Sequence, residues 1–575
     1  MSARRLWVVV LVLVVGGITV VGRAVQVTVF EGEAWRDRAQ RQHRQMIEVP
    51  GPRGTIRSAD GYVLATSLER VAIQVDTNLL ADPVLFAHAA APILNIDSDD
   101  LAARLVDGPR TVWLAKQALV ETGETIRELE PTAVVMVPDF ARAYPLASVA
   151  APVVGFVGRE ELRTIGRAGL EHHYDEALAG EPQTFLAVND AIQRKVRLER
   201  LESGRAGFDL ELAIHARLQA VCETELQRAM DELRADAASA VVLEPRTGAI
   251  LALGSLPSFD PSDDPGGAPH DRWRLRPVQD AIEPGSTVKP VVAAAALAAG
   301  LIEPGERFDC RGRGTRLAGF WIRDHAEPGR YTLDEVVAFS ANTGIIEIAE
   351  RIPKDHLYRT FSAFGFGRRS GIDFPAEARG LVPEVATWSR LSRAGFALGQ
   401  ELTATPLQMA LAYAAIANGG WLPEPRLVNG LTAEDCSVPS SDPSRARVLD
   451  AQLAGRLTSM LESVIVEGTG ESARIQGYRV AGKTGTAQRA VNGGFDDENH
   501  VAWFAGFFPL PDPKLVIVVA IENPRADFWG STAAAPVFAR IGEAAAGHLD
   551  LPREGDRAFV RAVHEAAAVR PGGGV

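Results

Sequence analysis

The sequence predicts a protein of the α+β class that carries one N-terminal membrane-spanning helix. Three observations support this prediction. Residues 6–22 form an apolar run without a charged side chain. Residues 240–254 and 502–521 each contain two apolar strands joined by a turn rich in glycine or proline, which is the pattern of an antiparallel hairpin. Residues 290–420 and 534–548 contain apolar helical stretches that would cover a sheet built from these hairpins.

The first element along the chain is the apolar run. It is slightly shorter than the roughly 20 residues that cross a bilayer, and an extension to Val27, with Arg23 reaching to the membrane surface, would complete the span. We predict a short cytoplasmic tail at residues 1–5 and an anchor at residues 6–27. The two arginines of the tail favour a cytoplasmic N-terminus and place the remaining chain outside. A cleaved signal peptide is the alternative, although no clear small-x-small cleavage pattern precedes Arg23.

Composition excludes some classes of function. The chain has 575 residues, enough for several domains. Its net charge of −13 argues against nucleic acid as a partner. Cys222, Cys310 and Cys436 are widely spaced and form neither a disulfide framework nor a metal-binding pattern. The pair His172-His173 has no third ligand at metal spacing, so we expect no metal.

The candidate nucleophile is Ser286, which a Pro-Gly turn places at the start of an apolar helix. Lys289 follows three residues later, so on a helix both side chains share one face. A serine hydroxyl attacks only when a base takes its proton. A lysine can be that base if burial lowers its pKa.

Lysine usage favours this chemistry over a solvated helix start. Of the 60 basic residues only six are lysine, which leaves 54 arginines. Arginine stays protonated in proteins and cannot act as a general base. A lysine in an arginine-rich chain therefore indicates a position where a neutral amine is useful.

Two further motifs follow Ser286. The first, Ser340-Ala341-Asn342, lies between two helical stretches, where its side chains could pass a proton and hold an amide. The second, Lys483-Thr484-Gly485-Thr486, lies in a strand, where Gly485 would let a substrate backbone approach and Thr486 would offer a hydroxyl and an N–H. Each motif alone is more often structural, but all three in this order form a strong signal.

With these motifs the chain resembles the class B penicillin-binding proteins, the monofunctional D,D-transpeptidases of peptidoglycan synthesis. Shorter flanking patterns strengthen the resemblance: Phe364-Gly365-Phe366-Gly367, Gly371-Ile372-Asp373, Gly399-Gln400, Thr405-Pro406-Leu407-Gln408 and Trp503-Phe504-Ala505-Gly506. The resemblance covers nearly all of the chain after the first 20 residues. It implies an elongated pedestal (dimerisation) domain at residues 28–207, a β-lactamase-like transpeptidase domain at residues 208–550 and a flexible tail at residues 551–575.

The resemblance also implies a role for each motif residue. Ser286 attacks the bond between the two D-alanines of a stem peptide, and Lys289 takes its proton. Ser340 and Asn342 pass the proton on and orient the peptide. Lys483 supplies positive potential, Thr484 and Thr486 bind the terminal carboxylate, and Gly485 lies beside the substrate. A neighbouring stem amine then forms the cross-link, β-lactams acylate Ser286 by the same route, and no cofactor is needed.

Alternatives remain at this stage. D,D-carboxypeptidases and serine β-lactamases share the motifs but are usually shorter and lack a pedestal. A non-catalytic scaffold would not need every motif residue intact. A β-lactam sensor would need a signalling domain, and we expect only a handful of residues on the cytoplasmic side. The layout around the anchor is most similar to the division-specific branch, which implies a SEDS-family glycosyltransferase and other divisome membrane proteins as partners. An elongation or sporulation role, the acceptor amino acid and the β-lactam spectrum stay open.

Overall fold

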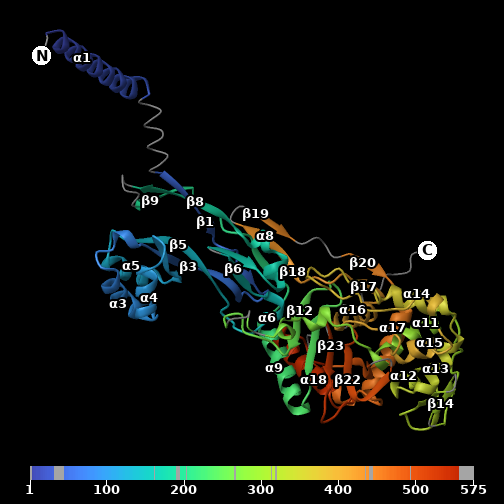
Figure 1. The fold of residues 1–575 in the computed structure, drawn as a ribbon. Helices are drawn as coiled ribbons and strands as arrows, with labels where there is room; N and C mark the ends of the chain where they lie inside the picture. The colour runs from blue at the N-terminus through green and yellow to red at the C-terminus, as the bar shows by residue number, and fades with distance from the viewer. Residues whose placement is uncertain are drawn as a thin grey trace.

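The computed structural model describes residues 3–31, 44–160, 162–189, 195–202, 204–263, 267, 269–312, 314–317, 320–433, 436–439, 444–491 and 494–555. After the N-terminal helix, the chain forms an elongated pedestal and then a larger domain of strands surrounded by helices (Figure 1). The predicted α+β class is confirmed.

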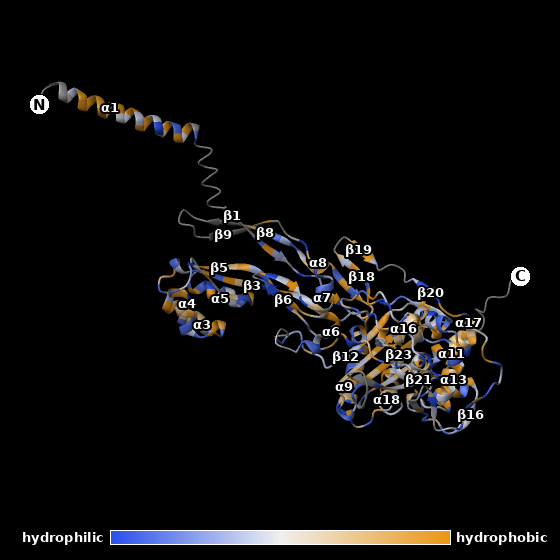
Figure 2. Cartoon of the chain, turned by 45° about the vertical axis from the view of Figure 1, so that its right-hand side comes forward, coloured by the Kyte–Doolittle hydropathy of each residue, from blue (hydrophilic) through white to orange (hydrophobic). Residues whose placement is uncertain are grey.

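The N-terminal helix is long and apolar enough to cross a membrane. It comprises α1 (Ala3–Val25) and a π-helical turn η1 (Gln26–Phe30). The stretch Trp7–Val29 has a mean hydropathy of 2.5 and no part of it is buried against the remaining chain, as the exposed apolar band in Figure 2 shows. Its 23 residues rise about 35 Å as a helix, compared with a hydrocarbon core of about 30 Å.

Two expectations near the termini fall largely outside the described residues. A polar, helical stalk at residues 31–46 is expected from the sequence, but residues 32–43 are not described. Its last three residues belong instead to strand β1 (Arg44–Gly51), so the stalk cannot be helical to Met46. The predicted tail at 551–575 is described only as far as residue 555.

The pedestal is built on two sheets. The larger has seven strands in the order β19-β18-β10-β2-β3-β4, with β5 also paired to β3. Its strands are β2 (Ile56–Arg57), β3 (Val63–Asp76), β4 (Thr111–Ala118), β5 (Val134–Ala143), β10 (Asp209–Leu212), β18 (Val428–Ala433) and β19 (Cys436–Pro439). The smaller sheet pairs β1 with β8 (Gly180–Asn189) and β8 with β9 (Lys195–Glu202).

Helices close the two ends of the pedestal. Those at the outer end pack on β3 to β5 and bury a separate apolar core: α3 (Pro83–Leu94), α4 (Ser98–Val106) and α5 (Val120–Leu129). The others lie near the second domain: α6 (Ala151–Val154), α7 (Gly169–His173) and α8 (Asp175–Leu178), together with the hairpin β6 (Val157–Glu160) and β7 (Arg163–Gly166).

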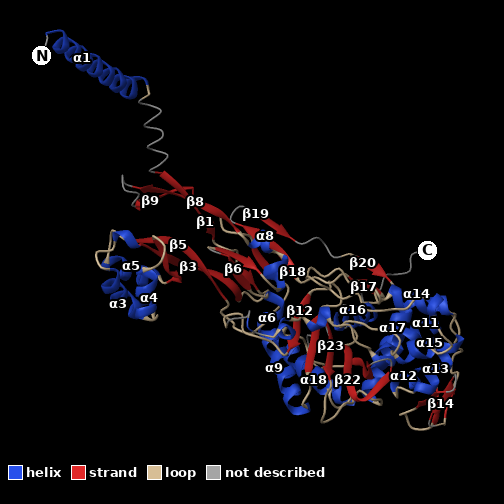
Figure 3. Cartoon of the chain, viewed as in Figure 1, coloured by secondary structure: helices blue, strands red, loops and turns tan. Residues whose placement is uncertain are grey.

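The second domain has a five-stranded antiparallel sheet in the order β12-β11-β23-β22-β21. Figure 3 shows its strands β12, β23 and β22 among the surrounding helices. The strands are β11 (Ala237–Leu243), β12 (Ile250–Leu256), β21 (Ala481–Val491), β22 (Gly494–Phe508) and β23 (Leu515–Glu522). The two predicted hairpins are β11–β12 and β22–β23. Every residue of β11 and β23 is buried, because successive side chains point to opposite faces and both faces are covered.

One face of this sheet is covered by α9 (Ala216–Leu233) and α18 (Ala534–His548). Most of the other helices lie on the opposite side: α10 (Arg276–Gln279), α11 (Lys289–Ala298), α12 (Leu333–Ala338), α13 (Asn342–Arg351), α14 (Lys354–Ala363), α15 (Ser392–Leu398), α16 (Pro406–Ala417) and α17 (Ala451–Val466). Six short strands form three antiparallel pairs between these helices in the sequence: β13 (Phe308–Cys310) with β16 (Gly329–Tyr331), β14 (Gly314–Leu317) with β15 (Phe320–Arg323), and β17 (Trp421–Pro423) with β20 (Arg445–Arg447).

Candidate active site

Ser286 lies in a 3-10 turn, η5 (Gly285–Val288), that leads directly into α11. Side chains three residues apart eclipse each other in a 3-10 helix, so Ser286 and Lys289 still share a face although the turn is not α-helical. Two side-chain hydrogen bonds to backbone oxygens hold the turn in place. Tyr413 Oη donates to Thr287 O at 2.9 Å, and Trp503 Nε1 donates to Glu283 O at 3.0 Å. Ser286 itself is half-buried, and its hydroxyl makes no hydrogen bond within the described part of the chain.

Lys289 is fully buried and its amine meets the second motif. Nζ lies 2.7 Å from Ser340 O, 3.1 Å from Ser340 Oγ and 2.8 Å from Asn342 Oδ1. Burial lowers the pKa of Lys289 to about 7, while the negative charge of Asp324 acts in the opposite direction. A neutral amine has two N–H groups and one lone pair. The two oxygen acceptors can take the N–H groups, which leaves the lone pair for a hydroxyl.

Two local features bring Ser340 and Asn342 to Lys289. Ser340 follows α12 in the left-handed region (φ 59°), which turns both its carbonyl and its hydroxyl toward the lysine. Asn342 is the first residue of α13 and donates from Nδ2 to Arg323 O at 2.9 Å. This hydrogen bond orients the amide so that Oδ1 faces Lys289.

The start of α13 is held by a residue that belongs to no motif. Asp324, in the loop after β15, accepts from the backbone N–H groups of Asn342 (3.1 Å) and Thr343 (2.9 Å) and from the Thr343 hydroxyl. Burial by itself would raise the pKa of Asp324, but these hydrogen bonds outweigh burial and lower it. Asp324 therefore acts as a charged cap supplied from another loop.

The third motif lies on β21, at the edge of the central sheet, directly beside η5. Glycines allow the close approach. A Cβ on Gly485 would lie 2.8 Å from Thr287 Cγ2 and 2.9 Å from Pro284 O, and one on Gly285 would lie 3.0 Å from Thr486 O. The sequence predicts that the space beside Gly485 admits a substrate backbone. On the side of Gly485 where a Cβ would lie, that space is occupied by the η5 turn.

Lys483 is fully buried, and Nζ donates to the carbonyl and hydroxyl oxygens of Thr484 at 3.1 and 3.3 Å. Burial, and then the positive charge of Lys289, lower the pKa of Lys483 well below its usual value. An anion bound nearby would favour its charged form. The hydroxyl of Thr484 pairs with Thr469 Oγ1 at 2.7 Å, and the hydroxyl of Thr486 accepts from Gly530 N at 3.0 Å.

The arrangement can therefore activate a serine, relay a proton and attract an anion. Comparisons with known proteins show the family to which the chain belongs. Residues 238–543 match the family described as the penicillin binding protein transpeptidase domain, and residues 48–212 match the penicillin-binding protein dimerisation domain. The chain belongs to the class B penicillin-binding proteins.

Relatives of this class match nearly the whole chain. The peptidoglycan D,D-transpeptidase FtsI of Escherichia coli (strain K12) is 33% identical over 503 residues, covering 86% of this chain and 83% of the relative. Stage V sporulation protein D of Bacillus subtilis (strain 168) is 32% identical over 505 residues, covering 85% and 77%. The structure of penicillin binding protein 3 from Mycobacterium tuberculosis, complexed with aztreonam, has a TM-score of 0.68 at 28% identity and covers 88% of this chain and 98% of that chain.

Some supporting residues of this class B penicillin-binding protein could not be found from the motifs. Asp324, Thr469 and Gly530 each contact a motif residue, but each is distant in sequence from its partner. Nothing in their immediate sequence distinguishes them, because the contacts exist only after folding.

Proposed function

We propose that this protein is a serine D-Ala-D-Ala transpeptidase that cross-links peptidoglycan stem peptides. The observation that carries the proposal is the buried amine of Lys289, with a pKa of about 7, in contact with Ser340 and Asn342. It lies in a domain of the transpeptidase family. The E. coli relative named above carries the same activity in its name.

In the acylation step, Ser286 Oγ attacks the carbonyl carbon between the two D-alanines. Its proton passes to neutral Lys289 and, through Ser340, to the nitrogen of the departing D-alanine, so that the peptide bond breaks as the ester forms. Backbone N–H groups of Ser286 and Thr486 would stabilise the oxyanion, and each such donor is typically worth about 2.7–4 kcal/mol. The close packing of Gly285 against β21 supports this pairing.

The motif strand would bind the substrate's terminal carboxylate. Thr484 and Thr486 offer hydroxyl groups, Gly485 keeps the strand against the serine turn, and Lys483 supplies positive potential, because a bound anion favours its charged form. In the second step, the amine of a neighbouring stem attacks the ester carbon. That amine loses a proton, Ser286 regains one, and the new amide is the cross-link.

A β-lactam tests this assignment. Ring opening by Ser286 breaks the lactam amide without a leaving group, so the whole drug stays on the protein. We expect intact mass spectrometry of the full-length protein in detergent to show one persistent benzylpenicillin adduct on the Ser286 peptide. An adduct that disappears as the drug is hydrolysed would favour a β-lactamase or carboxypeptidase. No adduct on folded protein would favour a non-catalytic scaffold.

We also propose where the protein works. Two arginines precede the apolar helix, which supports a single-pass protein of the bacterial cell membrane with a cytoplasmic N-terminus and the catalytic domain outside. A division role, with a SEDS-family glycosyltransferase and divisome membrane proteins as partners, is supported by the similarity to the division-specific branch. A sporulation role is the second candidate, because the B. subtilis relative is matched at nearly the same identity.

Depletion of the protein in its host separates these roles. Filaments without septa would support division, rounded cells would support elongation, and normal growth without spores would support sporulation. Copurification of a SEDS-family protein through the anchor and pedestal tests the partner.

A further inference from the structure

Three side chains with metal-binding groups meet where the pedestal packs on the transpeptidase domain. The ring nitrogens His215 Nδ1 and His548 Nε2 lie 3.1 Å apart. One carboxylate oxygen of Asp60 and one ring nitrogen of each histidine all lie within 4.8 Å of one another, and all three residues are half-buried. None of them takes part in the catalytic arrangement around Ser286.

Three separate elements supply these groups. Asp60 lies in the turn between β2 and β3 of the pedestal, His215 directly precedes α9, and His548 is the last residue of α18. The two histidines are 333 residues apart in sequence, so only the tertiary fold brings them together.

A structural role accounts for Asp60 but not for the histidine pair. The Asp60 carboxylate accepts from the backbone N–H groups of Ala216 (2.8 Å) and Arg217 (3.2 Å) and from Ser58 Oγ (2.7 Å), and so caps α9. These contacts fix the position of the carboxylate. The His215 side chain makes no capping hydrogen bond, and its ring is turned toward His548 instead.

We propose that Asp60, His215 and His548 bind one divalent transition-metal ion of the zinc class. Zinc binds imidazole nitrogen at about 2.0–2.1 Å with tetrahedral angles, which places two such nitrogens roughly 3.3 Å apart. The observed 3.1 Å separation therefore needs only a small adjustment. Two nitrogens and one carboxylate oxygen suit zinc better than calcium or magnesium, which prefer oxygen ligands alone.

Charges around the site permit a cation. The guanidinium of Arg217, two residues after His215, donates to Tyr62 Oη at 2.8 Å and lies over the Tyr62 ring. His548 is at the C-terminal end of α18, where the helix dipole favours positive charge. A bound ion would join the pedestal turn to α9 and α18, the two helices on one face of the catalytic sheet.

The test uses full-length protein without a polyhistidine tag, in detergent and stripped with a chelator. Isothermal titration with zinc chloride should give one ion per chain, and zinc should raise the melting temperature by a few degrees. His548→Gln keeps a hydrogen-bonding group beside His215 but is a poor zinc ligand, so we expect at least a tenfold loss of zinc affinity. His88→Gln changes an exposed histidine on α3 and should bind zinc as the wild type does.

Benzylpenicillin acylation should stay normal in His548→Gln, which shows that the variant is folded. Absence of stoichiometric zinc binding to the wild-type protein would overturn the proposal, and so would equal affinity in His548→Gln. In the first case the two histidines simply share a hydrogen bond; in the second the ion binds elsewhere.

Discussion

At the scale of single residues, the proposed reaction depends on Ser286 as nucleophile. Ser286→Ala removes only a hydroxyl that has no hydrogen bond within the described chain. We therefore expect complete loss of covalent labelling by a fluorescent penicillin with an unchanged melting temperature. Labelling that survives in the variant would mean that another residue is the nucleophile.

Lys289 gives the reaction its expected pH dependence. Only the neutral amine can accept the serine proton, and its pKa is about 7, so the acylation rate constant should rise as pH increases through 7 and then level off. Lys289→Arg keeps a positive charge but cannot lose a proton, so acylation should fall by at least 100-fold at every pH, since general bases contribute roughly 100- to 10,000-fold. Stopped-flow acylation with a chromogenic cephalosporin measures the pH dependence of the wild-type rate constant and the loss of rate in Lys289→Arg. A wild-type rate constant that does not change with pH would contradict the role of Lys289 as base.

The motif residues could be found in the sequence because their chemistry restricts the residue type. Ser286 and Lys289 stand at fixed local spacing, and lysine is rare in this chain. Asp324 could not be found, because its function is to accept hydrogen bonds from a helix start 18 residues later. The left-handed backbone of Ser340 was equally hidden, since serine has no special preference for that region.

At the scale of elements, the loop that carries Asp324 positions the helix that carries Asn342. Asp324→Asn keeps one acceptor oxygen but places an NH₂ group against backbone donors, so we expect slower acylation and a loss of about 1 kcal/mol in stability. The substitution also removes a negative charge that raises the Lys289 pKa. The rise of the acylation rate constant with pH (the acid limb of the pH–rate profile) should therefore move to lower pH.

A pH–rate profile of the variant separates positioning from a general loss of stability, because unfolding alone would not move the limb. Asp309→Asn is the matched control, since Asp309 is exposed on β13 and, within the described part of the chain, its ion pair is with Arg311. A limb that stays in place, or moves upward, would contradict the electrostatic coupling of Asp324 and Lys289.

The edge strand β21 is held against its surroundings by glycine. A Cβ on Gly530 would lie 2.3 Å from Gly485 O and 2.5 Å from Trp503 O, both backbone atoms. Gly530→Ala should therefore displace β21 and lower the acylation rate by roughly 10- to 100-fold. Gly455→Ala is the control: its Cβ meets no atom within 4 Å, so acylation should be unchanged and α17 slightly more stable. Equal rates in the two variants would show that the strand tolerates the displacement.

The hairpins and α18 followed from apolar periodicity and turn residues, because those signals are local. The participation of β10 and β18 in the pedestal sheet was not predictable in the same way. These strands pair residues more than 200 positions apart, such as Glu211 and Gly430. Short strands of this kind carry no pattern that identifies their partner.

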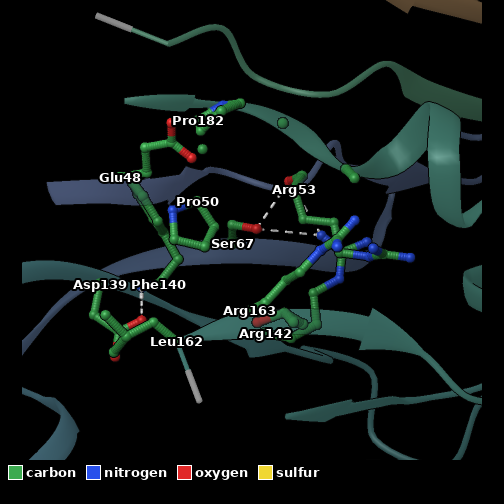
Figure 4. A pocket seen from close by; sticks show the side chains of 14 residues that line it. Glu48, Pro50, Arg53, Ser67, Asp139, Phe140, Arg142, Leu162, Arg163 and Pro182 are labelled. Carbon is green, nitrogen blue, oxygen red and sulfur yellow. Dashed lines mark hydrogen bonds between the residues drawn. The ribbon is translucent and has the colours of Figure 1, made fainter. Parts of the chain in front are cut away.

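At the scale of the whole molecule, the pedestal depends on a buried cluster of charges beside a cavity of about 380 Å³ (Figure 4). Arg53 and Arg142, two of the labelled residues, both donate at 2.6 Å to the carboxylate of Glu171, which is completely buried. Arg53 lies between β1 and β2, Arg142 in β5 and Glu171 in α7, so one carboxylate joins three elements. Their contacts are those of a structural scaffold.

Glu171→Gln should consequently weaken the pedestal far more than the catalytic domain. Removing one partner from a buried ion pair typically costs about 3–5 kcal/mol. Arg53 keeps an ion pair with Asp175 at 2.7 Å, whereas Arg142 loses the charged partner that it has among the described residues. Glu160→Gln, at an exposed pair with Arg167, should cost no more than about 1 kcal/mol.

Differential scanning calorimetry with and without benzylpenicillin can distinguish the two domains, because acylation changes the unfolding of the catalytic domain. We expect the transition that does not respond to the drug to move to lower temperature in Glu171→Gln, while the rate of Ser286 acylation at 25 °C stays close to that of the wild type. A loss of acylation equal to that of Gly530→Ala would instead mean that the pedestal cluster also positions the active site.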